Sequence, residues 1–280
     1  MGDGSNAAQI DYWNAQAGET WSRFNELLDR QIEPLGREAM RALDPRPGER
    51  IVDIGCGCGQ TTMALAERVG AAGAVMGADI SRPMLEVARA RALPAGARQP
   101  EFREADAQSD ILGEAAFDAA FSRFGVMFFA DPVAAFANIR AALTLPGRLA
   151  FVCWRPYLDN PWMRIPMEAA EPLLGPAPPV DPTAPGPFAF ADADRVRGIL
   201  DRAGFAGVTI EAFDAQIGGS SVDDTVSMTF RVGPLGRALA EHRDRIPAVA
   251  EAVKAAVTPY ATEAGVFMPS AVWIVQARAS

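Results

Sequence analysis

Ile51-Val52-Asp53-Ile54-Gly55-Cys56-Gly57-Cys58-Gly59-Gln60 is the segment from which the architecture of this chain can be inferred. Apolar residues of strand character around Asp53 lead into three glycines at alternate positions, and a helical pattern over 61–69 follows at once. Glycine allows a tight turn and leaves no Cβ between the backbone and a ligand. A strand–loop–helix unit also directs free backbone N–H groups at whatever lies over the loop. The segment therefore predicts a small-molecule site.

Strands and helices alternate along the chain after this segment. Predicted strands cover 74–78, a short stretch near Phe102, 117–121 and 148–154; predicted helices begin at Ser81-Arg82-Pro83 and cover 132–143. Further along, the pattern predicts a helix over 192–203, a strand over 208–213, helices near 222–230, 235–242 and 246–260, and a last strand over 271–278. Strands that alternate with helices indicate parallel βαβ units with right-handed crossovers, and hence an α/β fold.

Two other segments have patterns of their own. Over residues 7–41 apolar residues recur at steps of three and four, which predicts helix; Gly18 interrupts the run and Pro34 bends it, so two or three helices are expected. Seven prolines lie between Pro172 and Pro187 and are expected to exclude a helix interior or a central strand there. This proline-rich segment is expected either to pack on its neighbours or to form a mobile lid.

Length and composition exclude several classes of protein. The chain has 280 residues, 49% hydrophobic and 22% charged, which is enough for a sizeable globular core. Its net charge of −9 opposes nucleic acid and anionic lipid as main ligands. Three cysteines argue against a disulfide scaffold and favour a reducing cytoplasm. No secretory signal and no apolar run of about 20 residues is evident, so a cytoplasmic protein without a membrane span is expected.

Acidic and polar residues follow the other predicted strands where a nucleoside ligand needs them. Asp79 ends the second strand, and a carboxylate there can accept two hydrogen bonds from the vicinal diol of a ribose. Asp106 follows the third strand and can accept from an exocyclic amine. The segment Ser122-Arg123-Phe124-Gly125 follows the fourth strand, where backbone groups face the middle of such a ligand.

Taken together, these segments resemble those of class I S-adenosylmethionine-dependent methyltransferases. The resemblance rests on residues 51–59, Asp79-Ile80-Ser81, Ala105-Asp106-Ala107, residues 117–121 and Leu145-Pro146-Gly147-Arg148-Leu149, in that order. More narrowly, they resemble small-molecule methyltransferases related to the enzymes of ubiquinone and menaquinone biosynthesis. The resemblance covers about residues 45–155 and, more loosely, Ala203-Gly204-Phe205. Arg148 stands where the family more usually has a second glycine, in a loop that lies far from the cofactor.

The resemblance implies a particular fold and division of the chain. The fold is a Rossmann-like sheet of seven mostly parallel strands with the last antiparallel, helices on both faces, and a helical cap over the active site. In this division, 1–44 is the N-terminal helical cap, 45–155 the cofactor-binding core and 156–191 the proline-rich cap or lid. Residues 192–280 complete the core with a helical insertion and the last two strands.

It also implies S-adenosylmethionine as cofactor, with S-adenosylhomocysteine as product. Asp53 and the glycines would lie against the methionine part, Asp79 would hold the ribose, and Asp106 with the Ala107 amide would contact the adenine. Ser122 and Arg123 would contribute backbone contacts only. The expected cofactor-binding residues are Trp21, Asp53, Gly55, Cys56, Gly57, Gln60, Thr61, Asp79, Ile80, Met84, Asp106, Ala107 and Ser122.

The methyl acceptor is expected to be a small apolar or aromatic molecule. The expected acceptor-binding residues are Tyr12, Trp13, Phe124, Trp154 and Trp162. An aromatic face beside the sulfonium would contribute roughly 0.5–2 kcal/mol. No catalytic base can be named, because the single histidine, His242, is expected on the surface. Cys56 and Cys58 provide too few ligands for zinc, so no metal is expected.

These expectations favour methyl transfer to an O, N or C nucleophile by in-line displacement, which requires mainly alignment of the reactants. A nicotinamide dehydrogenase would require Gly-x-Gly-x-x-Gly, whereas Gln60 follows Gly59. The net charge opposes a nucleic-acid methyltransferase. A non-catalytic protein that binds S-adenosylmethionine remains open, as does the choice between monomer and homodimer.

Overall fold

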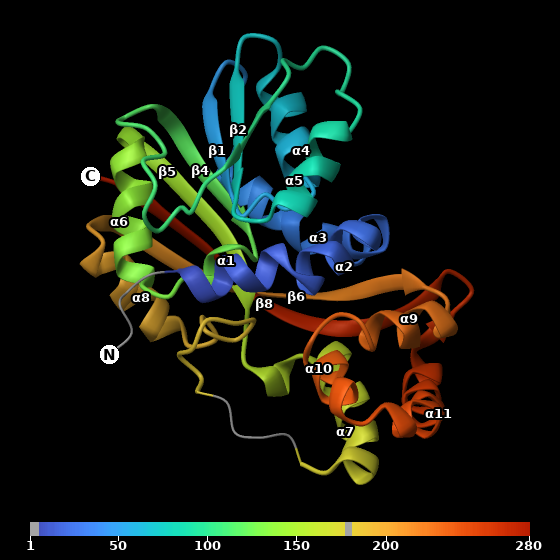
Figure 1. The fold of residues 1–280 in the computed structure, drawn as a ribbon. Coiled ribbons are helices and arrows are strands. Elements are labelled where there is room, and N and C mark those ends of the chain that lie inside the picture. The colour runs from blue at the N-terminus through green and yellow to red at the C-terminus, as the bar shows by residue number, and fades with distance from the viewer. Residues whose placement is uncertain (1–5, 177–180) are drawn as a thin grey trace.

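A single twisted sheet forms the centre of the protein in a computed structural model that describes residues 6–176 and 181–280. The strand order is β3-β2-β1-β4-β5-β8-β6 (Figure 1). β1 to β5 pair in parallel, and β8 runs antiparallel between β5 and β6. The expected seven-stranded order with an antiparallel last strand is confirmed. The strands are β1 (Arg50–Ile54), β2 (Ala74–Asp79), β3 (Glu101–Glu104), β4 (Phe117–Arg123), β5 (Leu143–Trp154), β6 (Phe205–Ser220) and β8 (Gly265–Ala279), with a short β7 (Ala261–Thr262) paired beside β8.

Helices cover both faces of this sheet. Figure 1 shows α3 (Asn25–Leu43), α4 (Gln60–Val69) and α5 (Arg82–Ala90) on one side, and α6 (Pro132–Ala142) and α8 (Ala193–Arg202) on the other. The central strands are buried on both faces, so they are nearly continuous apolar runs. Fully buried aromatic rings on the α6 side fill the space between layers: Phe136, Phe151 and Phe190. Phe121 is fully buried on the opposite face, because its register partner in β5 is Ala150 and side chains alternate between the two faces of a sheet.

The N-terminal region forms three helices, as expected: α1 (Ala7–Asn14), α2 (Gln16–Arg23) and α3. The breaks between them lie at Ala15 and Phe24, so the expectation that Gly18 interrupts the run was wrong. Gly18 lies inside α2, where a Cβ would come within 2.6 Å of the Ser81 hydroxyl, so this glycine permits close packing. Pro34 lies inside α3, whose buried face holds the helix together despite the lost N–H bond.

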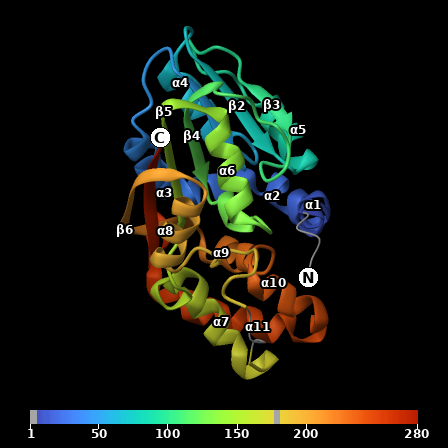
Figure 2. The same ribbon diagram turned by 90° about the vertical axis from the view of Figure 1, so that its left-hand side faces the viewer.

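A second group of helices lies beyond the carboxyl end of β5 (Figures 1 and 2). β6 and β8 continue past Trp154 as a two-stranded ribbon, in which Ile217 pairs with Met268. Around the ribbon gather α7 (Pro161–Leu174), α9 (Val222–Thr229), α10 (Pro234–Glu241) and α11 (Ile246–Val257). They share a separate apolar core of Ala170, Val226, Leu235, Leu239, Val249, Val253, Val257, Val266 and Met268.

The proline-rich segment differs from its prediction. α7 includes Pro166 and Pro172, so proline does not exclude a helix there. This helix packs on α11, and burial of residues such as Ala170 outweighs the lost backbone bonds. Residues 177–180, also within the predicted lid, lie outside the described residues. From residue 181 the segment packs on its neighbours: the Gly186 amide donates to the Met127 carbonyl at 3.1 Å.

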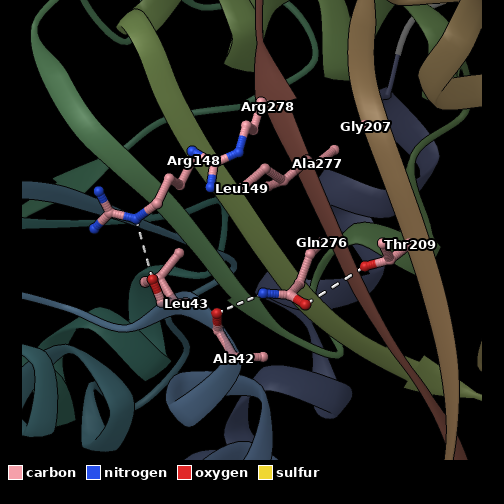
Figure 3. A pocket seen from close by; sticks show the side chains of 9 residues that line it. All are labelled: Ala42, Leu43, Arg148, Leu149, Gly207, Thr209, Gln276, Ala277 and Arg278. Atoms are coloured by element: carbon pink, nitrogen blue, oxygen red, sulfur yellow. Dashed lines mark hydrogen bonds between the residues drawn. The ribbon is translucent and has the colours of Figure 1, made fainter.

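A small cavity of about 150 Å³ lies at the amino end of the parallel strands, away from the glycine loop (Figure 3). Arg148 lines this cavity and lies within β5, so the loop that was expected there is part of a strand. The Arg148 guanidinium donates to the Leu43 carbonyl at 3.2 Å and pairs with Glu49 at 2.7 Å. Gln276 donates to the Ala42 carbonyl at 2.6 Å. These side chains bind the end of α3 to the sheet.

Candidate functional site

The loop between β1 and α4 has the conformation that its glycines predict. Gly55, Gly57 and Gly59 have φ angles of +65°, +53° and +81°, in the left-handed region that disfavours other residues. A Cβ on Gly55 would lie 2.7 Å from the Cα of Gly125, and one on Gly57 would lie 2.7 Å from the methyl of Met84. The loop backbone therefore carries no side chain at these three positions, where the ends of β1, β2 and β4 converge.

Asp53 lies beneath this loop and is fully buried. Its Oδ2 accepts hydrogen bonds from the Thr61 and Thr62 hydroxyls, both at 2.7 Å, whereas its Oδ1 has no partner among the described residues. Burial raises the pKa of Asp53 to about 6; the two threonine hydroxyls and the nearby Arg123 oppose that rise. A buried carboxylate oxygen without a donor suits a ligand that brings one, such as the ammonium group of a methionine moiety.

Asp79, at the end of β2, joins two loops of the site. Its Oδ2 accepts from the Gly57 amide at 2.7 Å and its Oδ1 from the Ser81 amide at 2.8 Å. Burial raises its pKa, and these backbone bonds oppose the rise. Each carboxylate oxygen can accept a second hydrogen bond, so the group retains capacity for a diol.

Asp106 follows β3 and meets the start of the N-terminal region. Its Oδ1 accepts from the Gln108 amide at 2.9 Å and from the Asn6 side chain at 3.1 Å. Ala107 follows in the same buried loop. Sequence reasoning missed Asn6, because a contact across 100 positions leaves no local signal.

The junction of α1 and α2 is held against the start of α5. Asn14 donates to the Ile80 carbonyl at 2.7 Å and accepts from the Arg82 amide at 2.9 Å. Ser81 precedes α5 as predicted, but its hydroxyl donates to the Trp13 carbonyl at 2.7 Å instead of capping the helix. The N-terminal helices thus meet the loop that carries Ile80, an expected cofactor contact.

An ion network links α3 to the glycine loop. Asp29 accepts from Arg123 at 2.8 Å and also pairs with Arg91. Arg123 donates in addition to the side-chain carbonyl of Gln60, and Arg91 donates to the Cys58 carbonyl. Arg123 was expected to contribute backbone contacts to the cofactor; its side chain has a structural role that was not predicted, because it connects β4, α3 and α4.

The expected aromatic residues form two groups. Trp13 makes edge contacts with Tyr12, Trp21 and Phe128, at ring-centroid distances of 5.3, 6.0 and 5.1 Å. Phe128 was not predicted. In the other group Phe124 stacks on Trp154 at 4.2 Å, and Trp154 meets Trp162 at 4.9 Å. Phe124 has a φ of +63°, which is rare for a bulky residue and marks a constrained backbone at the end of β4.

The remaining candidates have local roles. Cys56 and Cys58 are buried, and burial raises the pKa of both thiols, to about 12 for Cys58. The Ser122 hydroxyl accepts from the Gly125 amide at 3.2 Å and so shapes the turn after β4. His242 is exposed at the end of α10. Across residues 6–176 and 181–280, no group of three or more His, Cys, Asp or Glu side chains has metal-binding geometry.

Comparison with known proteins agrees with this arrangement. A family model described as a methyltransferase domain matches residues 51–147. An aklanonic acid methyltransferase, DauC, from Streptomyces sp. (strain C5) is 34% identical over 151 residues, which cover 54% of this chain and 67% of that protein. O-methyltransferase cnsE from Penicillium expansum is 31% identical over 202 residues, covering 70% of this chain and 64% of that protein. A demethylmenaquinone methyltransferase from Corynebacterium kroppenstedtii is 34% identical over 137 residues, covering 49% of this chain and 55% of that protein.

Solved structures share the fold at low sequence identity. The YcgJ protein from Bacillus subtilis superposes with a TM-score of 0.57 at 19% identity, covering 88% of this chain and 97% of that one. A putative methyltransferase from Bacillus halodurans gives a TM-score of 0.56 at 18% identity, covering 87% of this chain and 97% of that one. Among the described residues no helix is long and apolar enough to cross a membrane.

Proposed function

Because this chain belongs to the class I S-adenosylmethionine-dependent methyltransferase family, we propose that it methylates an O, N or C nucleophile of a small apolar or aromatic molecule. The relatives are named for aklanonic acid and demethylmenaquinone, and others are O-methyltransferases, which supports a small organic acceptor. The alignments with these relatives cover between 55% and 67% of their length, so the acceptor is inferred from the site of this chain.

The observation that carries the proposal is the Oδ1 of Asp53, which has no hydrogen-bond partner in residues 6–176 and 181–280 and lies beneath the glycine loop. The ammonium of the cofactor's methionine part would supply the missing donor, and the first turn of α4 with Gln60 and Thr61 would meet its carboxylate. Asp79 would accept from the ribose diol, and Asp106 with the Ala107 amide would meet the adenine. Ile80 and Met84 would pack on its faces.

The chemistry that the cofactor supplies is an electrophilic methyl group on a cationic sulfur. The residues of this chain bind and align the two reactants and keep water from the methyl group. We assign the rings of Trp13, Trp21 and Phe128, which contact one another, to one apolar wall of the acceptor site, and those of Phe124, Trp154 and Trp162 to another. A planar or apolar acceptor suits such walls. No side chain is assigned as a general base, since alignment suffices for a strong nucleophile.

The division of the chain follows from these roles. We assign residues 1–44 to a cap over the cofactor, 45–155 to the cofactor-binding core, and 156–191 to a cap on the acceptor side. Residues 192–280 complete the sheet with β6 and β8 and also contain the three helices α9, α10 and α11. The buried reduced thiols and the net charge of −9 favour a cytoplasmic protein without nucleic acid as partner, as monomer or homodimer.

Turnover tests this proposal. The protein is incubated with S-adenosylmethionine and a panel of phenols, quinols, amines and enolisable ketones, and S-adenosylhomocysteine and methylated products are measured by mass spectrometry. We expect stoichiometric formation of both with at least one phenol, quinol or ketone, and loss of turnover in Asp79→Ala. Binding of the cofactor without turnover on any acceptor class would contradict the proposed activity.

A further inference from the structure

Asn6, which immediately precedes α1, is buried although it is polar and lies near the start of the chain, with 6% of its surface exposed. Its Nδ2 donates to the Oδ1 of Asp106 at 3.1 Å. Its own Oδ1 is buried and has no hydrogen-bond partner in the part of the chain that the structure describes. Buried amide oxygens rarely lack a donor, so the arrangement indicates that a ligand provides one.

The chemistry of Asp106 determines which way the Asn6 amide points. An ionised carboxylate can only accept hydrogen bonds, so the Nδ2 of Asn6 must face Asp106 and its Oδ1 must face away. The Oδ1 of Asp106 already accepts two hydrogen bonds, from Asn6 and from the Gln108 amide. Its Oδ2 accepts a longer one from the Ser109 hydroxyl at 3.2 Å and retains a lone pair. An acceptor on Asn6 and an acceptor on Asp106 are thereby held close together.

Gln9 adds a similar group on the same side of α1. It lies three positions after Asn6, and residues at this spacing share one face of a helix. Its Oε1 is likewise buried without a partner within the described residues. Neighbouring acceptors without donors of their own suit a ligand group that carries two N–H donors, as the exocyclic amine of adenine does. They disfavour a carbonyl oxygen at the same position.

We propose that Asn6 is a specificity-determining residue for the base of the cofactor. This inference rests on the proposed function and extends it to the N-terminal region. Asp106 accepts one N–H of the exocyclic amine, and the Oδ1 of Asn6 accepts the other. Asn6 thereby makes binding of adenine depend on the position of α1, which Asn14 holds through Ile80 and Arg82.

The experiment compares two ligands that differ at this amine and at the adjacent ring nitrogen N1, which bears a hydrogen in the inosyl compound. S-adenosylhomocysteine carries the amine, whereas S-inosylhomocysteine carries a carbonyl oxygen in its place. Calorimetry gives the dissociation constants of both for the full chain and for Asn6→Ala. We expect Asn6→Ala to weaken binding of S-adenosylhomocysteine by about fivefold, the value of one lost hydrogen bond, and not to weaken binding of S-inosylhomocysteine, whose carbonyl oxygen faces one acceptor fewer in the variant. The preference for the amine then falls by about fivefold or more.

Asn14→Ala is the matched control, because Asn14 anchors the same helix without a hydrogen bond to Asp106. We expect Asn14→Ala to raise the dissociation constants of both ligands by the same factor. Asn6→Leu keeps a side chain of similar volume. Together with thermal unfolding of each variant, it shows whether a change in affinity reflects a folding defect. Equal weakening of both ligands by Asn6→Ala and Asn6→Leu, or no effect on either ligand, would overturn the inference. Failure of the unaltered protein to bind S-adenosylhomocysteine would instead contradict the proposed function.

Discussion

Arg123, at the end of β4, donates a hydrogen bond to Asp29 of α3 at 2.8 Å, and both side chains are nearly buried. Asp29 also pairs with Arg91, which follows α5. Each arginine in turn holds the glycine-loop region, Arg123 through the Gln60 side chain and Arg91 through the Cys58 carbonyl. One carboxylate on the N-terminal cap therefore connects three elements that surround the proposed methionine subsite.

Replacing Asp29 with Asn should lower the free energy of unfolding by about 3 kcal/mol, because it leaves two guanidinium groups without their counter-charge in a largely desolvated place. Urea unfolding measures this change. The control is Asp223→Asn, whose carboxylate pairs with Lys254 with both partners exposed to solvent. That variant should change the stability by less than about 1 kcal/mol. Equal effects of the two variants would show that Asp29 is an ordinary surface carboxylate.

Asp79→Ala should weaken binding of S-adenosylhomocysteine by about tenfold or more, because charge-assisted hydrogen bonds to the ribose diol are lost. The variant also removes the acceptor of the Gly57 and Ser81 amides, which shape the loop. Calorimetry provides the measurement. Glu104→Ala is the control, since Glu104 ends the neighbouring strand and pairs with Arg82 on the surface. Unchanged affinity in folded Asp79→Ala would show that the ribose is held elsewhere.

Asp53 should make the stability of the ligand-free protein depend on pH. Its pKa is about 6 in the folded protein, above an ordinary value of 3.8, so between these values the folded state binds more protons than the unfolded state. Stability from this group is therefore greatest below pH 4 and is lost as pH rises through 6, by about 3 kcal/mol in total. The difference in unfolding free energy between the unaltered protein and Asp53→Asn, followed from pH 4 to pH 7, isolates this contribution.

Ligand binding should show the opposite dependence on pH. The cofactor's ammonium favours ionised Asp53, so affinity for S-adenosylhomocysteine should fall as pH drops below about 6, by up to about tenfold per pH unit. Asn at this position cannot titrate, and this decline should disappear in Asp53→Asn. A pH profile of binding that is the same in both proteins would rule out Asp53 as the partner of the ammonium.

Gly57→Ala should damage binding and stability together, whereas Gly70→Ala should damage stability alone. Both glycines have positive φ, so alanine at either position costs about 1–2 kcal/mol of backbone strain. A Cβ on Gly57 would lie 2.7 Å from the methyl of Met84, in the loop of the proposed site, whereas a Cβ on Gly70 meets no atom of the described residues within 4 Å. Titration with S-adenosylhomocysteine and thermal unfolding separate the two effects. Undiminished affinity in Gly57→Ala would place the ligand away from the loop.

The glycine loop and the central strands were predicted from the sequence, because neighbouring residues determine their conformation. The glycines after Asp53 require positive φ, and apolar runs such as 117–121 fit strands buried on both faces, so the core was predicted closely. β6 was predicted over 208–213 but extends from Phe205 to Ser220. Gly218 and Gly219 were not expected in a strand. At position 218 the strand requires glycine, because a Cβ there would collide with the Val266 carbonyl of β8.

Tertiary contacts explain what sequence reasoning missed. α7 forms through its packing on α11, against the local preference of Pro166 and Pro172. Asn6 and Asp29 gain their roles from partners 62 to 100 positions away in the chain. Such contacts depend on how the N-terminal helices are placed over the sheet, and neither residue type nor spacing encodes that placement locally.

The most direct test of the central claim is calorimetric titration of the protein with S-adenosylhomocysteine. Nothing needs to be known of the acceptor for this measurement, and Asp79→Ala serves as its reference. We predict saturable binding of one ligand per chain at micromolar concentrations, about tenfold or more weaker in Asp79→Ala. Absence of binding to the folded, unaltered protein, or binding that is identical in the variant, would contradict the account.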